Sequence, residues 1–256
     1  MPVDLFIDNH FVYTVEDIKM SEDTMELTAQ KYLNNDRLLH IDMIEAIRLN
    51  EADILYAGED GVLIYQIPGG IYMLSAANEE SAKRISALIK TAQLIVLHQP
   101  YLKDELMARF ALTKTMVCHQ AAYFSNAPIK TPEEQADIRP LQTDDFPVVM
   151  EHYSSLPDPE YIKSRISAGM LGIYVDNQLA GFIGTHPEGT IGMLEILPEY
   201  RRRGLAFLLE SAMMARQQSK SRLPFAQIVE GNEASIALHR KLGMEITRDA
   251  HIWWLY

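Results

Sequence analysis

The stretch EILPEYRRRGLAFLLE, residues 195–210, contains the sharpest change of character in the chain. An apolar, strand-like segment stops at Pro198, a basic turn follows at Arg201–Arg203, and a helix-like apolar run begins after Gly204. The first turn of a helix has unpaired N–H groups, and the helix dipole adds partial positive charge there. Arginines at that end oppose the dipole, so helix stability gives no reason for them. The stretch therefore predicts a strand–turn–helix unit that binds an anion. A solvated basic surface is the alternative.

The glycine and alanine of this turn suit a phosphate group. Gly204 allows close approach of the backbone, and the small Ala206 leaves the next turn clear. Arginine side chains add charge and fork-shaped donors. The turn lacks the lysine–serine/threonine end of a P-loop, and it lacks the three spaced glycines of a dinucleotide-binding fingerprint. Those two phosphate-binding motifs are therefore excluded.

Bulk composition narrows the class of protein. The chain has 256 residues, 48% of them hydrophobic and 23% charged, which is typical of a soluble protein of about two domains. The net charge of −12 disfavours nucleic acid as a partner. No apolar run approaches the roughly 20 residues of a membrane span, and the first residues lack a signal-peptide pattern. With Cys118 as the one cysteine and no disulfide, we expect a cytoplasmic protein without a metal.

The order of predicted elements indicates a mixed α/β (α+β) fold in two halves. Residues 52–67 are typical of a hairpin turning at 59–61, Asn78 suits a helix N-cap, and residues 203–219 predict a long amphipathic helix. Three strands are expected within 171–197, with turns at Asn177 and at 188–189. Further elements are expected at 42–49, 92–99, 101–110, 113–124, 225–229, 232–243 and 250–256. The polar, proline-containing segment 125–140 is the predicted linker, which gives domains at 1–127 and 136–256.

The cofactor turn resembles a known family. LPEYRRRGLA is similar to the Arg/Gln-x-x-Gly-x-Gly/Ala motif of the GNAT superfamily of N-acyltransferases, with Arg201, Gly204 and Ala206 at the motif positions. The resemblance implies that the turn binds the pyrophosphate of coenzyme A. It also implies that the preceding strand splays from its neighbour and pairs with the pantetheine arm. The cofactor-binding residues are then Glu195, Ile196, Leu197, Arg201, Arg202, Arg203, Gly204, Leu205, Ala206, Asn232 and Ser235.

A second motif, NEASIALHRKLGM at 232–244, is similar to the downstream motif of the same superfamily. Independently of the resemblance, Asn232, Ser235 and His239 have the spacing of one helical face, and Asn232 suits the helix N-cap. Most relatives have a tyrosine at the position of His239, which protonates the departing thiolate. Because histidine is protonatable near neutral pH, His239 is our candidate general acid, and an exposed structural histidine is the alternative.

The general base is less well defined. Many relatives have a glutamate near the start of the cofactor strand, where this chain has Thr190, which is no base at neutral pH. Glu188, His186 and Glu195 lie nearby, and Glu230 is more distant along the chain. Glu195 interrupts an apolar strand and is our candidate base, with an ion pair to the arginine run as its alternative. Glu188 lies in a predicted turn, so we expect it to be solvated.

These features together predict a GNAT-type N-acyltransferase, closest in motif spacing to the glycine N-acyltransferase-like branch. Its C-terminal domain is expected to hold a mixed, mainly antiparallel sheet flanked by helices. A smaller cofactor-free α/β domain of similar layout is expected to precede it. The predicted reaction transfers an acyl group from acetyl-CoA, or another short acyl-CoA, to a primary amine on a small molecule or peptide. The alternative is a catalytically silent acyl-CoA-binding or sensing module. The sequence leaves open whether the chain forms a homodimer.

Overall fold

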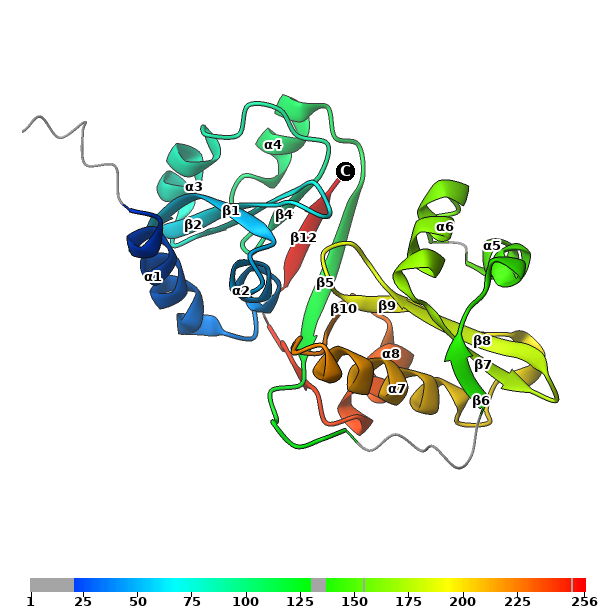
Figure 1. Ribbon diagram of the computed structural model, residues 1–256. Helices are drawn as coiled ribbons and strands as arrows, with labels where there is room; N and C mark the ends of the chain where they lie inside the picture. Colours follow the sequence, from blue (N-terminus) through cyan, green and yellow to red (C-terminus); the bar gives the residue numbers. More distant parts are fainter. Residues whose placement is uncertain (1–20, 130–136, 154, 250) are drawn as a thin grey trace, which may run out of the picture.

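The structure of the chain is a computed structural model that describes residues 21–129, 137–153, 155–249 and 251–256 (Figure 1). The N-terminal half starts with two helices and then builds a hairpin and a third strand. Its elements are α1 (Glu22–Leu33), α2 (Ile41–Arg48), β1 (Ala52–Gly58), β2 (Gly61–Gln66), β3 (Ile71–Ala76), α3 (Glu79–Ser86), β4 (Ile95–Leu97), α4 (Lys103–Phe110) and β5 (Thr115–Ala122). The predicted hairpin turn and the Asn78 cap are confirmed.

The C-terminal half repeats this layout. Three strands are followed by a helix, a strand, a second helix and a terminal strand. Its elements are β6 (Asp137–Pro140), α5 (Phe146–His152), α6 (Pro159–Ala168), β7 (Leu171–Val175), β8 (Gln178–Thr185), β9 (Ile191–Ile196), α7 (Leu205–Ser219), β10 (Phe225–Val229), α8 (Glu233–Lys241), β11 (Glu245–Ile246) and β12 (Ile252–Leu255). Short 3-10 turns occur at Asn34–Asp36, Thr143–Asp145 and Pro198–Tyr200.

One continuous sheet runs through both halves of the described chain. Its order is β1-β2-β3-β4-β12-β5-β10-β9-β8-β7-β6, with the short β11 paired to β5. Parallel pairing occurs at β3–β4 and at β9–β10, and the other neighbouring strands in the described residues are antiparallel. Helices flank the sheet on both faces (Figure 1). The predicted fold class, a mixed and mainly antiparallel sheet flanked by helices after a domain of similar layout, is confirmed.

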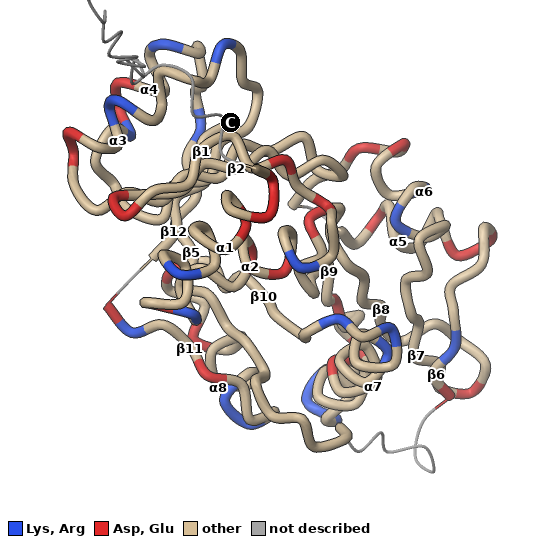
Figure 2. The backbone as a smooth tube through the Cα atoms, turned by 60° about the vertical axis from the view of Figure 1, so that its left-hand side comes forward, with Lys and Arg blue, Asp and Glu red and all other residues tan. Residues whose placement is uncertain are grey.

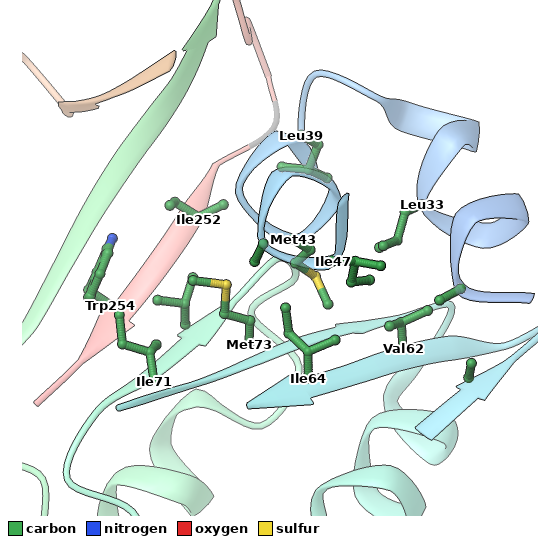
Figure 3. Packing of buried hydrophobic residues seen from close by; sticks show 14 of the residues in the cluster. Leu33, Leu39, Met43, Ile47, Val62, Ile64, Ile71, Met73, Ile252 and Trp254 are labelled. Atoms are coloured by element: carbon green, nitrogen blue, oxygen red, sulfur yellow. The ribbon is translucent and has the colours of Figure 1, made fainter. Parts of the chain in front are cut away.

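The two halves exchange their last strands. β12, at the end of the chain, pairs with β4 of the N-terminal half and with β5, while β5 pairs with β10 of the C-terminal half. Figure 3 shows Ile252 and Trp254 of β12 among Met43 and Met73 of the N-terminal core. Local sequence pattern identified the terminal strand but carried no information about its partner. The division near residues 127–136 therefore stays a proposal about chain segments, whereas the sheet crosses it.

Two apolar clusters cover opposite faces of the C-terminal part of the sheet. α7 and α8 pack on one face, where Leu205, Leu209 and Met213 meet Ile191 of β9 and Ile228 of β10. Residues of α5 and α6 form the other cluster, which includes Val149, Ile162, Ile166, Phe182 and Met193. Figure 1 shows these two helix pairs on the two sides of β7–β9. Any group that passes from one face to the other must therefore pass between strands.

Some local predictions differ from the structure. The predicted linker is strand β6 at Asp137–Pro140, because those residues pair with β7, and residues 130–136 lie outside the described part. The helix after Asn78 ends at Ser86, and the apolar Ile89 packs into the core after the helix has ended. The long helix begins at Leu205 and ends at Ser219, close to the predicted bounds.

Candidate functional site

The strands β9 and β10 part almost at once. Their parallel pairing is limited to Ala226 and Ile191 in the described residues, although both strands continue for several residues beyond that contact. β9 also carries a bulge, since Met193 has a φ of 55° and the register with β8 shifts between Phe182 and Gly184. A bulge leaves backbone groups outside the regular ladder. The result is a gap in the sheet with free hydrogen-bonding groups along β9, into which an extended chain can fit.

The basic turn lies at the carboxyl end of that gap. Arg202 has a φ of 63° and Gly204 a φ of 79°, so two left-handed residues turn successive N–H groups to one side. α7 has no side-chain cap, and no protein group of the described chain accepts a hydrogen bond from the N–H groups of residues 203–206. A Cβ built on Gly204 would meet nothing within 4 Å. The turn therefore presents open, positively polarised N–H groups, as an anion site requires.

Arg201 and Arg203 of the basic turn have different surroundings. Arg201 turns back to the strand, where its Nε donates to the Ile196 carbonyl at 2.9 Å and its Nη2 lies 3.2 Å from Glu195 Oε1. The Arg203 guanidinium lies 5.7 Å from the ring centre of Tyr200. Figure 2 shows blue segments gathered beside α7 and β8. Charge is thus concentrated at the turn although the chain as a whole is acidic.

Glu195 forms the ion pair that was the alternative to its role as a base. The pair is partly exposed, with 35% of the Glu195 side chain accessible, and it braces the turn against the strand that precedes it. Three other residues that were predicted to bind the cofactor lie close in the chain to this ion pair. Leu197 is buried just before the 3-10 turn, and Leu205 and Ala206 form the first residues of α7.

The second motif lies on α8. Asn232 caps this helix, since its side chain accepts a hydrogen bond from the N–H of Ser235 at 3.1 Å. The expectation of an exposed histidine as the alternative for His239 is wrong, because the residue is only 5% exposed. Its Nδ1 lies 2.8 Å from the Ser235 carbonyl and its Nε2 lies 3.5 Å from Glu210 Oε1 of α7. Sequence reasoning missed Glu210, which is buried beside apolar neighbours in α7.

Glu210 controls the charge of His239. Burial by itself lowers the pKa of His239, but the nearby Glu210 carboxylate, together with the Ser235 carbonyl, outweighs it and raises the pKa above its ordinary value. The Ser235 carbonyl at Nδ1 requires a proton on that nitrogen, and the Glu210 carboxylate favours a second proton on Nε2.

The candidate bases differ in burial. Thr190, at the usual glutamate position, is 1% exposed and donates from Oγ1 to Glu188 Oε1 at 2.7 Å. Glu188 is 8% exposed, so the expectation of a solvated turn residue is wrong. His186 shares a hydrogen bond with the Tyr161 hydroxyl. Glu230 has a side chain that is 61% exposed and lies 3.6 Å from His251. The site that combines burial with a carboxylate is therefore the turn that carries Glu188.

Three further findings concern features outside this site. Among the described residues there is no group of three or more His, Cys, Asp or Glu side chains arranged to hold a metal ion. No helix in the described ranges has the length and apolar character to cross a membrane. Cys118 is fully buried, and burial raises the pKa of its thiol to about 12, which agrees with a packing role.

The sequence matches a family model over part of its length. Residues 170–254 match the family described as FR47-like protein. This region contains β9, the basic turn, α7, β10 and α8. A search of curated proteins found no match.

Several solved structures resemble the whole chain. A Drosophila protein is 18% identical with a TM-score of 0.64, covering 92% of this chain and 96% of its own. A putative GNAT-family acetyltransferase from Novosphingobium aromaticivorans is 19% identical with a TM-score of 0.51, covering 84% and 94%. A GCN5-related N-acetyltransferase from Kribbella flavida is 12% identical with a TM-score of 0.50, covering 85% and 94%. These likenesses show a GNAT-type fold. They do not distinguish the glycine N-acyltransferase branch.

Proposed function

We propose that the chain is an acyl-CoA-dependent N-acyltransferase, with acetyl-CoA or another short acyl-CoA as donor and a primary amine as acceptor. The observation that carries the proposal is the open turn at residues 203–206 beside the parted strands β9 and β10. The unpaired N–H groups suit a pyrophosphate, and the gap suits an extended arm that pairs with β9. The GNAT-type fold of the structural neighbours supports the same donor.

The proposed reaction is direct attack of the amine on the thioester. The bulge at Met193 turns backbone N–H groups of β9 away from the ladder, where they can stabilise the oxyanion of the tetrahedral intermediate. His239 is the proposed acid for the departing thiolate, and the upward shift of its pKa favours the protonated ring that this step needs. Asn232 and Ser235 hold the start of α8, and so fix the position of His239.

Calorimetric titration with acetyl-CoA tests the binding site. Gly204→Glu places a carboxylate where the pyrophosphate is expected, so we expect micromolar binding by the wild type and none by the variant. Because position 204 has a φ of 79°, Gly204→Ala controls for backbone strain. Ala77→Glu adds the same charge to the equivalent turn of the N-terminal half, where residue 77 is exposed, and should leave binding unchanged. A wild type that does not bind acetyl-CoA would refute the proposal.

A silent binding module gives the same calorimetric result. The two functions differ in thiol release on addition of an amine, which the transferase shows and the module does not. His239→Phe separates them further, because it removes the proposed acid and preserves ring volume. For the transferase we expect acetyl-CoA binding to persist in this variant while amine-dependent thiol release falls by about 100-fold.

A further inference from the structure

The turn between β8 and β9 holds a buried carboxylate beside the gap. The Glu188 side chain lies in this turn, which ends at Thr190, one residue before the single contact between β9 and β10. The turn itself is fixed by two backbone hydrogen bonds, from the His186 N–H to the Thr190 carbonyl and from the Gly189 N–H to the His186 carbonyl. The carboxylate is therefore held at the closed end of the gap, opposite to the basic turn.

The surroundings of Glu188 are polar and aromatic. In the part of the chain that the structure describes, no Lys, Arg or His nitrogen lies within 4.0 Å of its carboxylate, and the Thr190 hydroxyl is the one group that donates to it. Tyr153 follows the end of α5, and Tyr161 of α6 shares a hydrogen bond with His186 of the same turn. Burial raises the pKa of both tyrosines, and the charge of Glu188 adds to the rise. A buried carboxylate without a cation is costly, so this arrangement favours a cationic ligand.

His186 and Arg165 both lie beside Tyr161. The His186 ring lies against β9, since a Cβ on Gly192 would come within 2.5 Å of His186 Nε2. The Arg165 guanidinium lies 5.8 Å from the Tyr161 ring centre and donates to the Thr185 carbonyl. We call Tyr153, Tyr161, His186, Glu188 and Thr190 the acceptor cluster.

The acceptor cluster and the basic turn lie on different faces of the sheet. Tyr153 belongs to the apolar cluster of α5 and α6, whereas the turn leads into α7 on the other face. The six residues of β9 separate them by about 20 Å at 3.3 Å per residue. An acyl-CoA held by its pyrophosphate at the turn would extend along β9 toward its start. The thioester would then lie in the gap between β9 and β10, which connects the two faces of the sheet.

We propose that Glu188, positioned by Thr190, binds the acceptor amine as an ammonium ion and takes its proton so that the neutral amine can attack. This step rests on the proposed function. The amine nitrogen bonds to the thioester carbonyl carbon, and the C–S bond then breaks. One ammonium proton passes to Glu188, a second passes from the nitrogen to solvent as the amide forms, and the thiolate takes a proton from His239. Glu188 and His239 then exchange protons with solvent, so one proton is released for each amide formed.

Binding of a cation can be tested without turnover. Methylammonium chloride is titrated into protein with ¹³C-labelled tyrosine rings, and sodium chloride at equal ionic strength serves as the reference. We expect methylammonium to shift the ring signals of Tyr153 and Tyr161 in the wild type but not in Glu188→Gln. Glu160→Gln removes an exposed carboxylate next to Tyr161 and should respond like the wild type. Absence of a methylammonium-specific shift in the wild type, or an equal shift in Glu188→Gln, overturns the proposal.

The proton-transfer step is tested with methylamine as acceptor and thiol release as the readout. Glu188→Gln is expected to lower the rate by at least about 100-fold and Thr190→Val by several-fold, with acetyl-CoA binding retained in both. A merely structural role of Thr190 would weaken binding and rate together. If thiol release is no faster in wild type than in Glu188→Gln, or if His186→Gln alone removes it, Glu188 is not the base. If the wild type does not bind acetyl-CoA, that result would instead refute the proposed function.

Discussion

The two halves share one layout but differ where the cofactor site would be. In the N-terminal half the parallel strands β3 and β4 pair over three residues, from Tyr72–Ile95 to Leu74–Leu97. In the C-terminal half the equivalent strands β9 and β10 pair at one residue. The first pair forms a closed sheet and the second leaves a gap. A similar sequence of elements is therefore compatible with either a continuous or a parted pair of parallel strands, and the strand register decides which.

The turns after these strands differ in the same way. The N-terminal turn is partly bonded within the protein, because Gln99 accepts from the Ala76 N–H at 2.7 Å and Asn78 accepts from the Ser81 N–H at 2.9 Å. Acidic residues, Glu79 and Glu80, occupy the first turn of α3, where they complement the helix dipole and repel anions. α7 has neither a cap nor an acidic first turn. The start of α3 is stabilised by a side-chain cap and acidic residues. The start of α7 has neither, so its N–H groups stay open to a ligand.

The largest expected effect comes from removing the strand that the halves share. Deletion of residues 251–256 exposes the edges of β4 and β5 and removes Ile252, Trp254 and Leu255 from the core. Each such loss costs about 2–5 kcal/mol, against a total stability of about 5–15 kcal/mol. We expect no cooperative urea transition by circular dichroism, whereas Tyr256→Ala should unfold nearly as the wild type does. A truncated chain with a normal transition would show that the halves are independent.

The basic turn can be weakened without adding a negative charge. Arg202→Gln with Arg203→Gln should lower acetyl-CoA affinity by about tenfold, which is ~1.4 kcal/mol, because two cations beside the pyrophosphate are lost. The salt dependence of binding should become shallower in the double variant. Lys83→Gln with Arg84→Gln, which changes two basic residues of α3, is the matched control and should bind as the wild type does. Equal acetyl-CoA affinities of the wild type and the two double variants would argue against the basic turn as the site of the pyrophosphate.

The two helix caps should separate stability from binding. Asn78→Ala and Asn232→Ala each remove a side-chain cap and should each destabilise the protein by about 1 kcal/mol in urea unfolding. Only Asn232→Ala should also weaken acetyl-CoA binding, because Asn232 holds the start of α8 beside the gap. If Asn78→Ala reduces binding as much, the difference that we draw between the halves is incorrect.

The smallest predicted effect is a pH dependence of the contact between α7 and α8. In the N-terminal half Arg109 of α4 donates to the Ser86 and Ile89 carbonyls, and arginine stays charged at all relevant pH values. In the C-terminal half α7 and α8 are joined by Glu210 and His239. Since the folded-state pKa of His239 is raised, its stabilisation is complete below the unfolded value of about 6.5 and is lost as the pH rises through the folded value.

The measurement is the free energy of unfolding of the wild type minus that of Glu210→Gln, taken at several pH values. We expect this difference to decrease as the pH rises above about 6.5. Arg109→Gln should lower stability by an amount that does not change with pH over the same range. A difference for Glu210→Gln that grows with pH would contradict the assigned charge of His239.

Sequence predicted the local elements better than the contacts between them. Alternation and helical spacing identified the hairpin, α7 and most strands of both halves but not β6 and β11, because those signals are local. The partner of β12 depends on long-range pairing, which no local pattern records. Glu188 was expected to be solvated because it lies in a turn, yet tertiary packing leaves it only 8% exposed. Glu210 and His239 meet only when α7 and α8 pack, so their pairing was equally invisible.

Hydrogen exchange of backbone amides tests most directly whether one half alone holds the cofactor. The exchange rates are compared with and without acetyl-CoA over β9 and residues 203–208, and over the equivalent turn at residues 77–82. We predict slower exchange in the first region, since the ligand pairs with N–H groups that have no protein acceptor there, and unchanged exchange in the second. Protection of both turns, or of residues 77–82 alone, would contradict the assignment of the cofactor to the C-terminal half.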